Sequence, residues 1–320
     1  MNQPDVKTLI CAVLACLGSS ADLFAQDKSD TLDKIRSSGV ITLGHRDTSI
    51  PFSYLDDAQR VVGFSIDLCS RVIDQIKTVT KRPDLQVKYQ PVTSATRIPL
   101  LANGTIDIEC GSTTNTVERQ AQVAFSSTTY LTTSNFVSKK SAGIRGFDDL
   151  KGRTVVSSAG TTSLRLLNEL NARKTLGMSI IPAKDHAEAF LMVATDRAAV
   201  FVMDDVLLAG LVANAQDSST YAISSEFLSV EPYAIMMRRD DPGFKQLVDA
   251  SLSEAFRSGD FERTYRKWFE SPIPPRNINL KLPMSAALKK VVQRPTDAAD
   301  PAAYQCAVKA AVRIEYRSIA

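Results

Sequence analysis

The sequence predicts an α/β protein with two compact lobes, each a mainly parallel sheet flanked by helices. Short apolar segments with strand character alternate with amphipathic helical segments along most of the chain, which is typical of α/β folds. The chain has 320 residues, of which 44% are hydrophobic and 23% are charged. This is ordinary globular composition, and the length suffices for two separate hydrophobic cores.

The first third of the chain contains three predicted helices and three predicted strands. The clearest helix starts at Ser65, because its apolar residues recur at the spacing of one helix face: Cys69, Val72, Ile73 and Ile76. Gly39 suits the left-handed residue that ends the first helix. The predicted order is helix 32–36, strand 40–43, helix from 65, strand 85–89, helix 97–101 and strand 106–109.

The second unit begins near residue 148 and repeats the alternation. The run at 199–203 is apolar throughout, as expected for a strand covered on both faces. Trp268, Phe261 and Phe269 have helical spacing and are expected in the core rather than in a ligand platform. The predicted elements are strand 154–156, helix 164–170, strand 179–181, helix 185–194, strand 199–203, strand 233–237, helix 242–258 and helix 261–269.

The first 25 residues are predicted to be a cleaved signal peptide. Lys7 precedes a short apolar run at 9–17, and small residues follow it. Cleavage is expected after Ala25, with Ala21 as the alternative. A lipid anchor at Cys16 and a buried N-terminal helix are the competing interpretations. The run is too short to span a bilayer, so a periplasmic protein is expected.

Composition excludes several classes of function. A formal net charge of +3, without a run of basic residues, argues against binding to nucleic acid or to an anionic membrane. Beyond the signal peptide three cysteines remain, Cys69, Cys110 and Cys306. Those in core elements are expected to be free thiols that behave as small hydrophobes. With two histidines and no C-x-x-C, neither a metal nor another cofactor is expected.

Eight polar residues fall where predicted strands end or where the next helices begin. In open α/β sheets, ligands bind beyond the carboxyl ends of the strands. These residues are therefore candidates for one binding site: Arg46, Arg97, Ser112, Thr114, Arg119, Thr161, His186 and Asp204.

The chemistry of this set suits a zwitterion with an additional carboxylate. Arginine presents a planar fork that matches the two oxygens of a carboxylate. Asp204 can neutralise an α-ammonium group, and the helix starts after Gly111 and Gly160 offer backbone N–H donors. No general acid or base is needed to account for these side chains.

The same residues are also compatible with simpler structural roles. Arg46 and Arg97 would be solvated bases if they lay on the surface. Ser112 and Thr114 would only cap the next helix, and His186 would make only a structural hydrogen bond. Of the two adjacent acids, we assign the helix N-cap to Asp205 and the ligand to Asp204.

At these positions the sequence resembles the glutamate/aspartate-binding proteins of polar amino-acid ABC importers, in solute-binding protein family 3. The resemblance extends over about residues 31–280, and the order and spacing of its motifs make it specific. The matching stretches are GHR at 44–46, NGTIDIECGSTTN at 103–115, VERQ at 117–120, GTTS at 160–163, AKDH at 183–186, MDDVLLAG at 203–210, KWF at 267–269 and PIPP at 272–275.

The resemblance implies a type II periplasmic-binding-protein fold with the ligand in the cleft between lobes. Lobe 1 is then discontinuous, comprising 30–134 and 229–280, and lobe 2 is inserted as 135–228, with crossings near Ser134 and Ser229. Residues 281–320 are expected to be a C-terminal appendage.

The resemblance also implies a role for each site residue. Arg119 would hold the α-carboxylate of the ligand, together with Ser112, Thr114 and Thr161. Asp204 would hold the α-ammonium group. Arg46, Arg97 and His186 would contact the side-chain carboxylate, the feature that separates binders of acidic ligands from their relatives.

The implied function is capture of L-glutamate or L-aspartate and delivery to the permease subunits of an ABC importer, by a monomer that is not an enzyme. Two other classes remain as alternatives. One is a dehydratase-like lyase on the same fold, for which His186 or Glu109 would be the acid or base. The other is a sensor module that presents an amino acid to a receptor.

Overall fold

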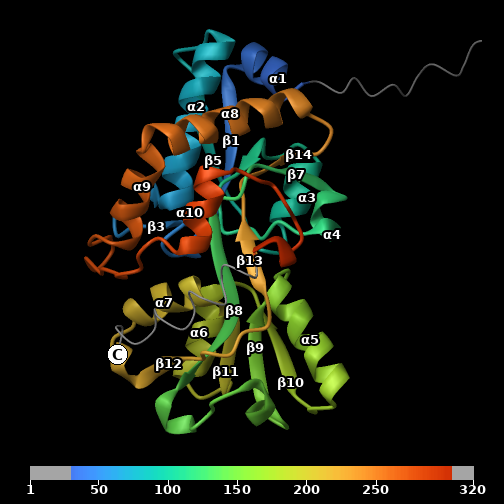
Figure 1. Ribbon diagram of the computed structural model, residues 1–320, viewed down its shortest axis with the longest axis vertical. Helices are drawn as coiled ribbons and strands as arrows, with labels where there is room; N and C mark the ends of the chain where they lie inside the picture. Colours follow the sequence, from blue (N-terminus) through green and yellow to red (C-terminus); the bar gives the residue numbers. More distant parts are fainter. Residues whose placement is uncertain (1–29, 305–320) are drawn as a thin grey trace, which may run out of the picture.

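The computed structural model describes residues 30–304 and has two lobes stacked along its long axis (Figure 1). Each lobe is built on its own sheet. Strands β8 (Tyr130–Lys139) and β13 (Val230–Tyr233) pair side by side and run between the lobes. The architecture confirms the predicted two-lobed α/β fold.

Lobe 1 surrounds a five-stranded sheet in the order β5-β1-β6-β14-β7. Strand β1 is parallel to β5 and β6, whereas β14 is antiparallel to β6 and β7. A single strand in this sheet is therefore reversed, which agrees with the expectation of a mainly parallel sheet. The strands are β1 (Val40–His45), β5 (Gln86–Pro91), β6 (Ile108–Glu109), β7 (Val123–Phe125) and β14 (Met236–Arg238); a small sheet adds β2 (Thr48–Ser49), β3 (Ser53–Leu55) and β4 (Val61–Val62).

The helices of lobe 1 come from both ends of the described chain. α2, α8 and α9 pack against one another, so the segment after β14 completes the lobe that the first residues begin. The helices are α1 (Thr31–Ser38), α2 (Phe64–Thr80), α3 (Arg97–Ala102), α4 (Val117–Gln120), α8 (Pro242–Ser258), α9 (Asp260–Phe269) and α10 (Ala286–Gln293).

Lobe 2 is built on the strand order β10-β9-β11-β8-β12, with β13 paired to β8. Strand β9 is parallel to β10 and β11, and β8 is antiparallel to each of its neighbours. The strands are β9 (Thr154–Ser158), β10 (Ser179–Ala183), β11 (Val200–Asp204) and β12 (Tyr221–Ile223); the helices are α5 (Thr162–Lys174), α6 (His186–Ala194) and α7 (Asp205–Ala213), with short 3-10 turns η1 (Lys140–Ala142), η2 (Phe147–Leu150) and η3 (Ser218–Thr220).

Local sequence explains where several helices begin and end. Gly39 adopts φ 68° and ends α1, as predicted. Asp241 accepts a hydrogen bond from the Phe244 N–H, and Pro242 follows it as the first residue of α8. Asp185 caps α6 in the same way through the Glu188 N–H. These caps position the helix starts at the edge of each sheet.

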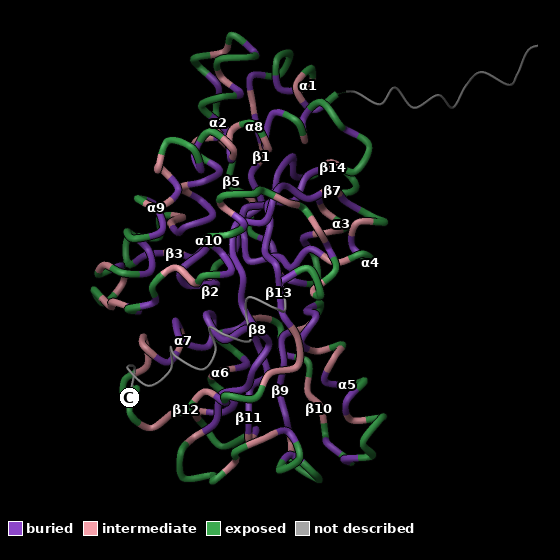
Figure 2. The backbone as a smooth tube through the Cα atoms, in the orientation of Figure 1, coloured by how far each residue is buried: buried purple, intermediate pink, exposed green. Residues whose placement is uncertain are grey.

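The aromatic residues of α9 belong to the core, as predicted. Phe261, Trp268 and Phe269 are buried, and Trp268 donates its indole N–H to Asp67. Phe269 packs on Phe52 with ring centroids 5.6 Å apart. Figure 2 shows that the buried residues follow the sheets of both lobes and the strands that join them.

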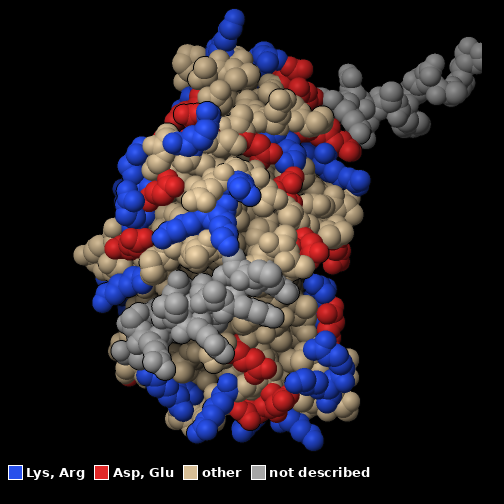
Figure 3. Space-filling view, in the orientation of Figure 1, with Lys and Arg blue, Asp and Glu red and all other residues tan. Residues whose placement is uncertain are grey.

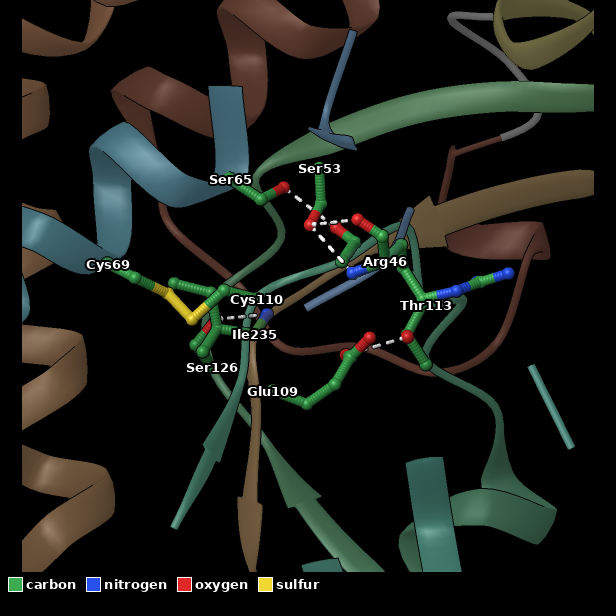
Figure 4. Close-up of a disulfide and its surroundings, with 10 residues drawn as sticks. Arg46, Ser53, Ser65, Cys69, Glu109, Cys110, Thr113, Ser126 and Ile235 are labelled. Atoms are coloured by element: carbon green, nitrogen blue, oxygen red, sulfur yellow. Dashed lines mark hydrogen bonds between the residues drawn. A yellow bond between two sulfur atoms is a disulfide. The ribbon is translucent and has the colours of Figure 1, made fainter. Parts of the chain in front are cut away.

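The prediction of free thiols at Cys69 and Cys110 is wrong, because the two residues form a disulfide (Figure 4). The bond joins α2 to the residue that follows β6, across a sequence separation of 41. Helical spacing and strand pattern place both residues in the core but do not show that the two segments meet. Cys306, the third cysteine, lies outside the described residues.

Two predicted strands differ from the structure. The strand expected at 233–237 is divided between β13 and β14, because the chain leaves β8 at Tyr233 and joins the lobe 1 sheet at Met236. Strand β8 was not predicted beyond a crossing near Ser134. Its sequence, YLTTSNFVSK, contains hydroxyl and amide side chains that obscure a strand pattern, although nine of its ten residues are buried.

The described part of the C-terminal appendage packs against lobe 1. Ala287, Leu288 and Val291 of α10 are buried. The Thr128 N–H donates to the Thr296 carbonyl, and the Asn115 side chain donates to the Asp297 carbonyl. Residues 282–304 therefore cover the start of β8 rather than extending away from the fold.

The predicted signal peptide, with Cys16, lies outside the described residues. Within residues 30–304, none of the helices is long and apolar enough to cross a membrane. On the face shown in Figure 3, basic and acidic side chains are interspersed over both lobes, consistent with the small net charge of +3.

Candidate functional site

All eight predicted site residues are buried where the two lobes face each other. Lobe 1 contributes five of them: Arg46 after β1, Arg97 at the start of α3, Ser112 and Thr114 after β6, and Arg119 in α4. Lobe 2 contributes Thr161 before α5, His186 at the start of α6, and Asp204 at the end of β11. Arg46 and Arg97 are each only 2% exposed, so neither is a solvated surface base.

Arg46 and His186 meet across the lobes. The Arg46 Nη2 lies 3.4 Å from the His186 Nε2, and the His186 Nδ1 lies 2.8 Å from the Ser158 hydroxyl. A guanidinium only donates, so Nε2 must accept and Nδ1 must carry the proton that Ser158 receives. Burial, together with the charges of Arg46 and Arg97, holds the pKa of His186 well below its usual range. The imidazole is therefore neutral at neutral pH.

Arg97 is anchored to the loop after β6. Its Nη1 donates to the Ser112 carbonyl at 3.0 Å and to the Thr113 hydroxyl. Burial lowers its pKa, and the negative charge of Glu109 opposes that effect. The same loop thus positions both a guanidinium and the Ser112 hydroxyl.

Arg119 connects the lobes through backbone carbonyls. Its Nη1 donates to Thr114 at 2.8 Å, and its Nη2 donates to Gly160 of lobe 2 at 3.1 Å. Burial, and next the charge of Arg97, lower the pKa of Arg119 to about 10. Burial and Arg97 likewise lower the pKa of Arg46 to about 10. These values leave Arg46 and Arg119 charged at neutral pH.

Asp204 faces the arginines from lobe 2. It accepts hydrogen bonds from the Tyr233 hydroxyl and, at 3.4 Å, from the Ser163 hydroxyl. Burial and the charge of Glu231 raise the pKa of Asp204 well above its usual range, while Arg119 acts in the opposite direction. A cation at this carboxylate would restore the ionised form.

The N-cap assignment to Asp205 is wrong. Asp204 precedes α7 in the N-cap position without a side-chain capping bond, and Asp205 is the first helical residue. The Asp205 carboxylate instead accepts hydrogen bonds from the hydroxyls of Thr132 and Thr133 in β8, and from the Val206 N–H. The helix therefore starts one residue earlier than this assignment implies, directly after Asp204, which still pairs with Ser134 in the sheet.

Ser112 and Thr114 do not cap the following helix. Thr116 caps α4 by accepting from the Arg119 N–H. Thr161 does serve as a cap, since its hydroxyl accepts from the Leu164 N–H and donates to the Ser158 carbonyl. Its side chain is therefore fixed at the start of α5, next to the lobe interface.

Several buried polar atoms at this interface have no hydrogen-bond partner in the part of the chain that the structure describes. A buried polar group without a partner destabilises a fold by about 1–3 kcal/mol, so a concentration of them indicates a polar ligand. The atoms are Arg46 Nη1, Arg97 Nε, Ser112 Oγ, Ser94 Oγ and Glu109 Oε1.

Four residues near the site were not among the eight candidates. Ser94 follows β5 and Ser158 ends β9, so the rule of strand ends would have identified both. Tyr233 lies at the site, where it donates a hydrogen bond to Asp204, because β13 pairs with β8, and the sequence does not reveal that pairing. Glu109 was identified only as a possible acid or base of an enzyme, and the structure places it beside the arginines.

Two glycines allow the lobes to approach closely. A Cβ at Gly160, which has φ +76°, would lie 2.5 Å from the Ala95 Cα of lobe 1. A Cβ at Gly210 in α7 would lie 2.7 Å from the Ile50 carbonyl oxygen. Real Cβ atoms do not approach backbone so closely, so this arrangement of the lobes requires glycine at both positions.

The site contains charged and hydroxyl groups but no metal centre that the structure reveals. Within residues 30–304, no group of three or more His, Cys, Asp or Glu side chains is placed to hold a metal ion. The donors are guanidiniums and hydroxyls, which suit carboxylates rather than cations. The carboxylate of Asp204 provides the complementary negative group.

Comparisons with known proteins agree on one family. Residues 41–271 match the model of the bacterial extracellular solute-binding proteins, family 3. The L-glutamate/L-aspartate-binding protein of Pseudomonas aeruginosa is 48% identical over 292 residues, covering 91% of this chain and 96% of that protein. The glutamate/aspartate import solute-binding protein of Escherichia coli is 44% identical over 299 residues, covering 93% of this chain and 99% of that protein.

Solved structures show the same fold. A mutant of ArgBP from T. maritima superposes with a TM-score of 0.67 at 27% identity, covering 75% of this chain and 99% of that chain. The two-lobed arrangement is thus shared with amino-acid-binding proteins.

Proposed function

Because this chain belongs to family 3 of the bacterial extracellular solute-binding proteins, we propose that it binds L-glutamate or L-aspartate between its lobes for an ABC importer. The observation that carries this proposal is the meeting of three buried arginines with one buried aspartate. Arg46, Arg97 and Arg119 supply positive charge from lobe 1, and Asp204 supplies the opposing carboxylate from lobe 2.

The proposed ligand orientation follows from these charges. Arg119, with Ser112, Thr114 and Thr161, would hold the α-carboxylate, and Asp204 would hold the α-ammonium. Arg46, Arg97 and His186 would receive the side-chain carboxylate. The partnerless Arg46 Nη1, Arg97 Nε and Ser112 Oγ support this orientation, since each is a donor that a carboxylate would satisfy.

Ligand binding is proposed to stabilise closed lobes. Strand β8 pairs with β13 up to Thr133 and with β11 from Ser134 onward, so its partners change at one point of the chain. This supports a hinge near Ser134 and Ser229, dividing 30–134 and 229–280 from 135–228. A ligand that contacts both lobes favours the closed state over the open one.

The closed monomer is proposed to dock on membrane permease subunits after export to the periplasm. Family membership supports an extracytoplasmic location. The ligand would be released unchanged, since each candidate acid or base has a structural partner: His186 with Ser158, and Glu109 with Thr113. Recovery of chemically unaltered glutamate after prolonged incubation tests this point, and any conversion would favour a lyase.

The binding proposal is tested by isothermal titration of the exported chain with glutamate, aspartate, glutamine and arginine. Glutamate or aspartate should bind one-to-one, and the other two should bind far more weakly because they leave arginine charge unpaired. Removing one partner of a buried ion pair costs roughly 3–5 kcal/mol. Arg119→Ala and Asp204→Ala should therefore each weaken binding by at least about a hundredfold.

The matched control is Arg257→Ala, which removes an arginine whose side chain is 75% exposed. It should bind as the wild type does. Retained binding in Arg119→Ala or Asp204→Ala, with an unchanged circular dichroism spectrum, would refute the assignment of those residues.

A further inference from the structure

Glu109 is a fully buried carboxylate beside the proposed side-chain end of the site. It ends β6, in register with Gly44 of β1 on one side and Met236 of β14 on the other. Its exposure is 0%, and Figure 4 shows its carboxyl group directed toward Thr113. The ligand roles proposed above do not use it.

Hydrogen bonds tie this carboxylate to Arg97. The Glu109 Oε2 accepts from the Thr113 hydroxyl at 2.8 Å, and the same hydroxyl accepts from the Arg97 Nη1. The other oxygen, Oε1, is buried without a hydrogen-bond partner. The carboxylate is therefore linked to Arg97 through the Thr113 hydroxyl, and only one of its two oxygens accepts a hydrogen bond.

Gly111 leaves room for the carboxylate next to Arg46. A Cβ at Gly111 would lie 2.2 Å from the Glu109 Oε1 and 3.0 Å from the Arg46 Cγ. The side chains of Glu109 and Arg46 therefore occupy the space that a Cβ at position 111 would need. Glu109 thus lies near the aliphatic part of Arg46 and is linked to the Arg97 guanidinium through the Thr113 hydroxyl.

The charges at this end of the site can be counted. Among the buried groups, Arg46 and Arg97 contribute two positive charges, Glu109 contributes one negative charge, and His186 is neutral. Asp185 also acts on Arg46, but it is partly exposed and its charge is screened by solvent. One positive charge remains, which equals the charge of a single side-chain carboxylate. Without Glu109, two positive charges would face the ligand in a buried setting where charge imbalance is unfavourable.

We propose that Glu109 is a specificity-determining residue that matches the site to a side chain with one negative charge and disfavours side chains with two. It acts through Arg46 and Arg97 rather than by touching the ligand, and the inference rests on the proposed binding function. The excluded class is amino acids with phosphonate or phosphate side chains, which carry close to two charges above their second ionisation.

The test compares two ligands of similar shape and different charge. L-cysteate has a tetrahedral sulfonate with one charge, and L-2-amino-3-phosphonopropionate has a tetrahedral phosphonate that approaches two. Each competes with L-glutamate in titrations at about pH 8.5. In Glu109→Gln, the affinity for phosphonate relative to sulfonate should rise at least about tenfold over wild type, because the second charge no longer opposes a nearby carboxylate.

Thr113→Ser is the matched control, since it changes the same cluster but keeps the hydroxyl that joins Glu109 to Arg97 and therefore the charge. Its phosphonate-to-sulfonate ratio should stay within about twofold of wild type, even if affinity for both ligands falls. An unchanged ratio in Glu109→Gln that still binds glutamate would overturn the inference while leaving the proposed function intact. Absence of glutamate binding in the wild type would instead refute the proposed function.

A pH series on the wild type tests the same inference without depending on the folding of Glu109→Gln. Between about pH 5.5 and 8.5 the phosphonate gains its second charge and the sulfonate does not. Wild-type affinity for the phosphonate, relative to cysteate, should fall at least about tenfold over this interval. Equal affinity for the singly and doubly charged forms would overturn the role of Glu109.

Discussion

Adding one methyl group at Gly210 should weaken ligand binding without harming the fold. Gly210 lies in α7 of lobe 2, and a Cβ there would be 2.7 Å from the Ile50 carbonyl oxygen and 3.2 Å from the Ile50 Cβ of lobe 1. Alanine is a better helix former than glycine by up to about 1 kcal/mol. Within lobe 2 alone, Gly210→Ala is therefore neutral or stabilising, and the conflict arises only from the contact with Ile50 of lobe 1.

The size of the effect follows from this overlap. Overpacking a close-packed contact costs about 1–3 kcal/mol, and every 1.4 kcal/mol is tenfold in affinity. If closure accompanies binding, Gly210→Ala should bind glutamate about 5–150-fold more weakly than wild type. The ligand-free protein can relieve the overlap by opening, so its thermal midpoint should be unchanged or higher.

Titration calorimetry measures the glutamate affinity of the wild type and of Gly210→Ala, and thermal unfolding measures their midpoints. Gly243→Ala is the matched control, because Gly243 is also helical but a Cβ there would meet nothing closer than 3.9 Å. It should bind as wild type does. If Gly210→Ala also binds glutamate with wild-type affinity, the contact between Gly210 and Ile50 is absent from the bound state and the reasoning fails.

Three further predictions concern the site and the disulfide. Because the pKa of Asp204 is raised above its ordinary value, the ligand-free wild type should lose stability relative to Asp204→Asn as pH rises from about 3.9 through the raised pKa. Glutamate affinity should change in the opposite direction and weaken as pH falls through the raised pKa, because an ammonium ligand requires the ionised carboxylate. Denaturation and titration series of the wild type and Asp204→Asn measure both effects as differences between the two proteins, and differences that do not change with pH would contradict this. Replacing Cys69 and Cys110 with alanine should lower the free energy of unfolding by roughly 3–5 kcal/mol, given the 41-residue separation; denaturant curves with equal midpoints would argue against it. Ser158→Ala should weaken glutamate binding about fivefold by freeing the His186 tautomer, whereas Ser141→Ala, at an exposed position of η1, should not change the titration; equal affinity in both variants would refute the tautomer assignment.

Much of the fold was predictable because its signals are local. Strand–helix alternation, the apolar face of α2 and the caps around α1 and α8 each depend on a few neighbouring residues. The long strand β8 was not predictable in the same way. Its hydroxyl side chains are buried because they meet Asp205 and Ser163 from distant parts of the chain, and such contacts leave no periodic signal.

The candidate site was likewise predictable in part: local signals identify its residues, but not all of their contacts. Strand ends and helix starts identify Arg46, Arg97, His186 and Asp204, since parallel strands bring their carboxyl ends to one edge. The resemblance to known binding proteins supplied their proposed roles. Neither source indicated that Cys69 would bond to Cys110, because pairing depends on how α2 packs across β6.

The sequence by itself determined the fold class, the identity of the charged residues and the family, because composition, spacing and motif order are properties of the chain. Only the tertiary structure decided which charges face one another. It made His186 neutral by burying it beside two arginines, and it raised the pKa of Asp204 by burial and by the charge of Glu231. It also set Glu109 beside Arg46 in the space left by Gly111. Electrostatic effects depend on distance and burial, and both are created only when the lobes fold and meet.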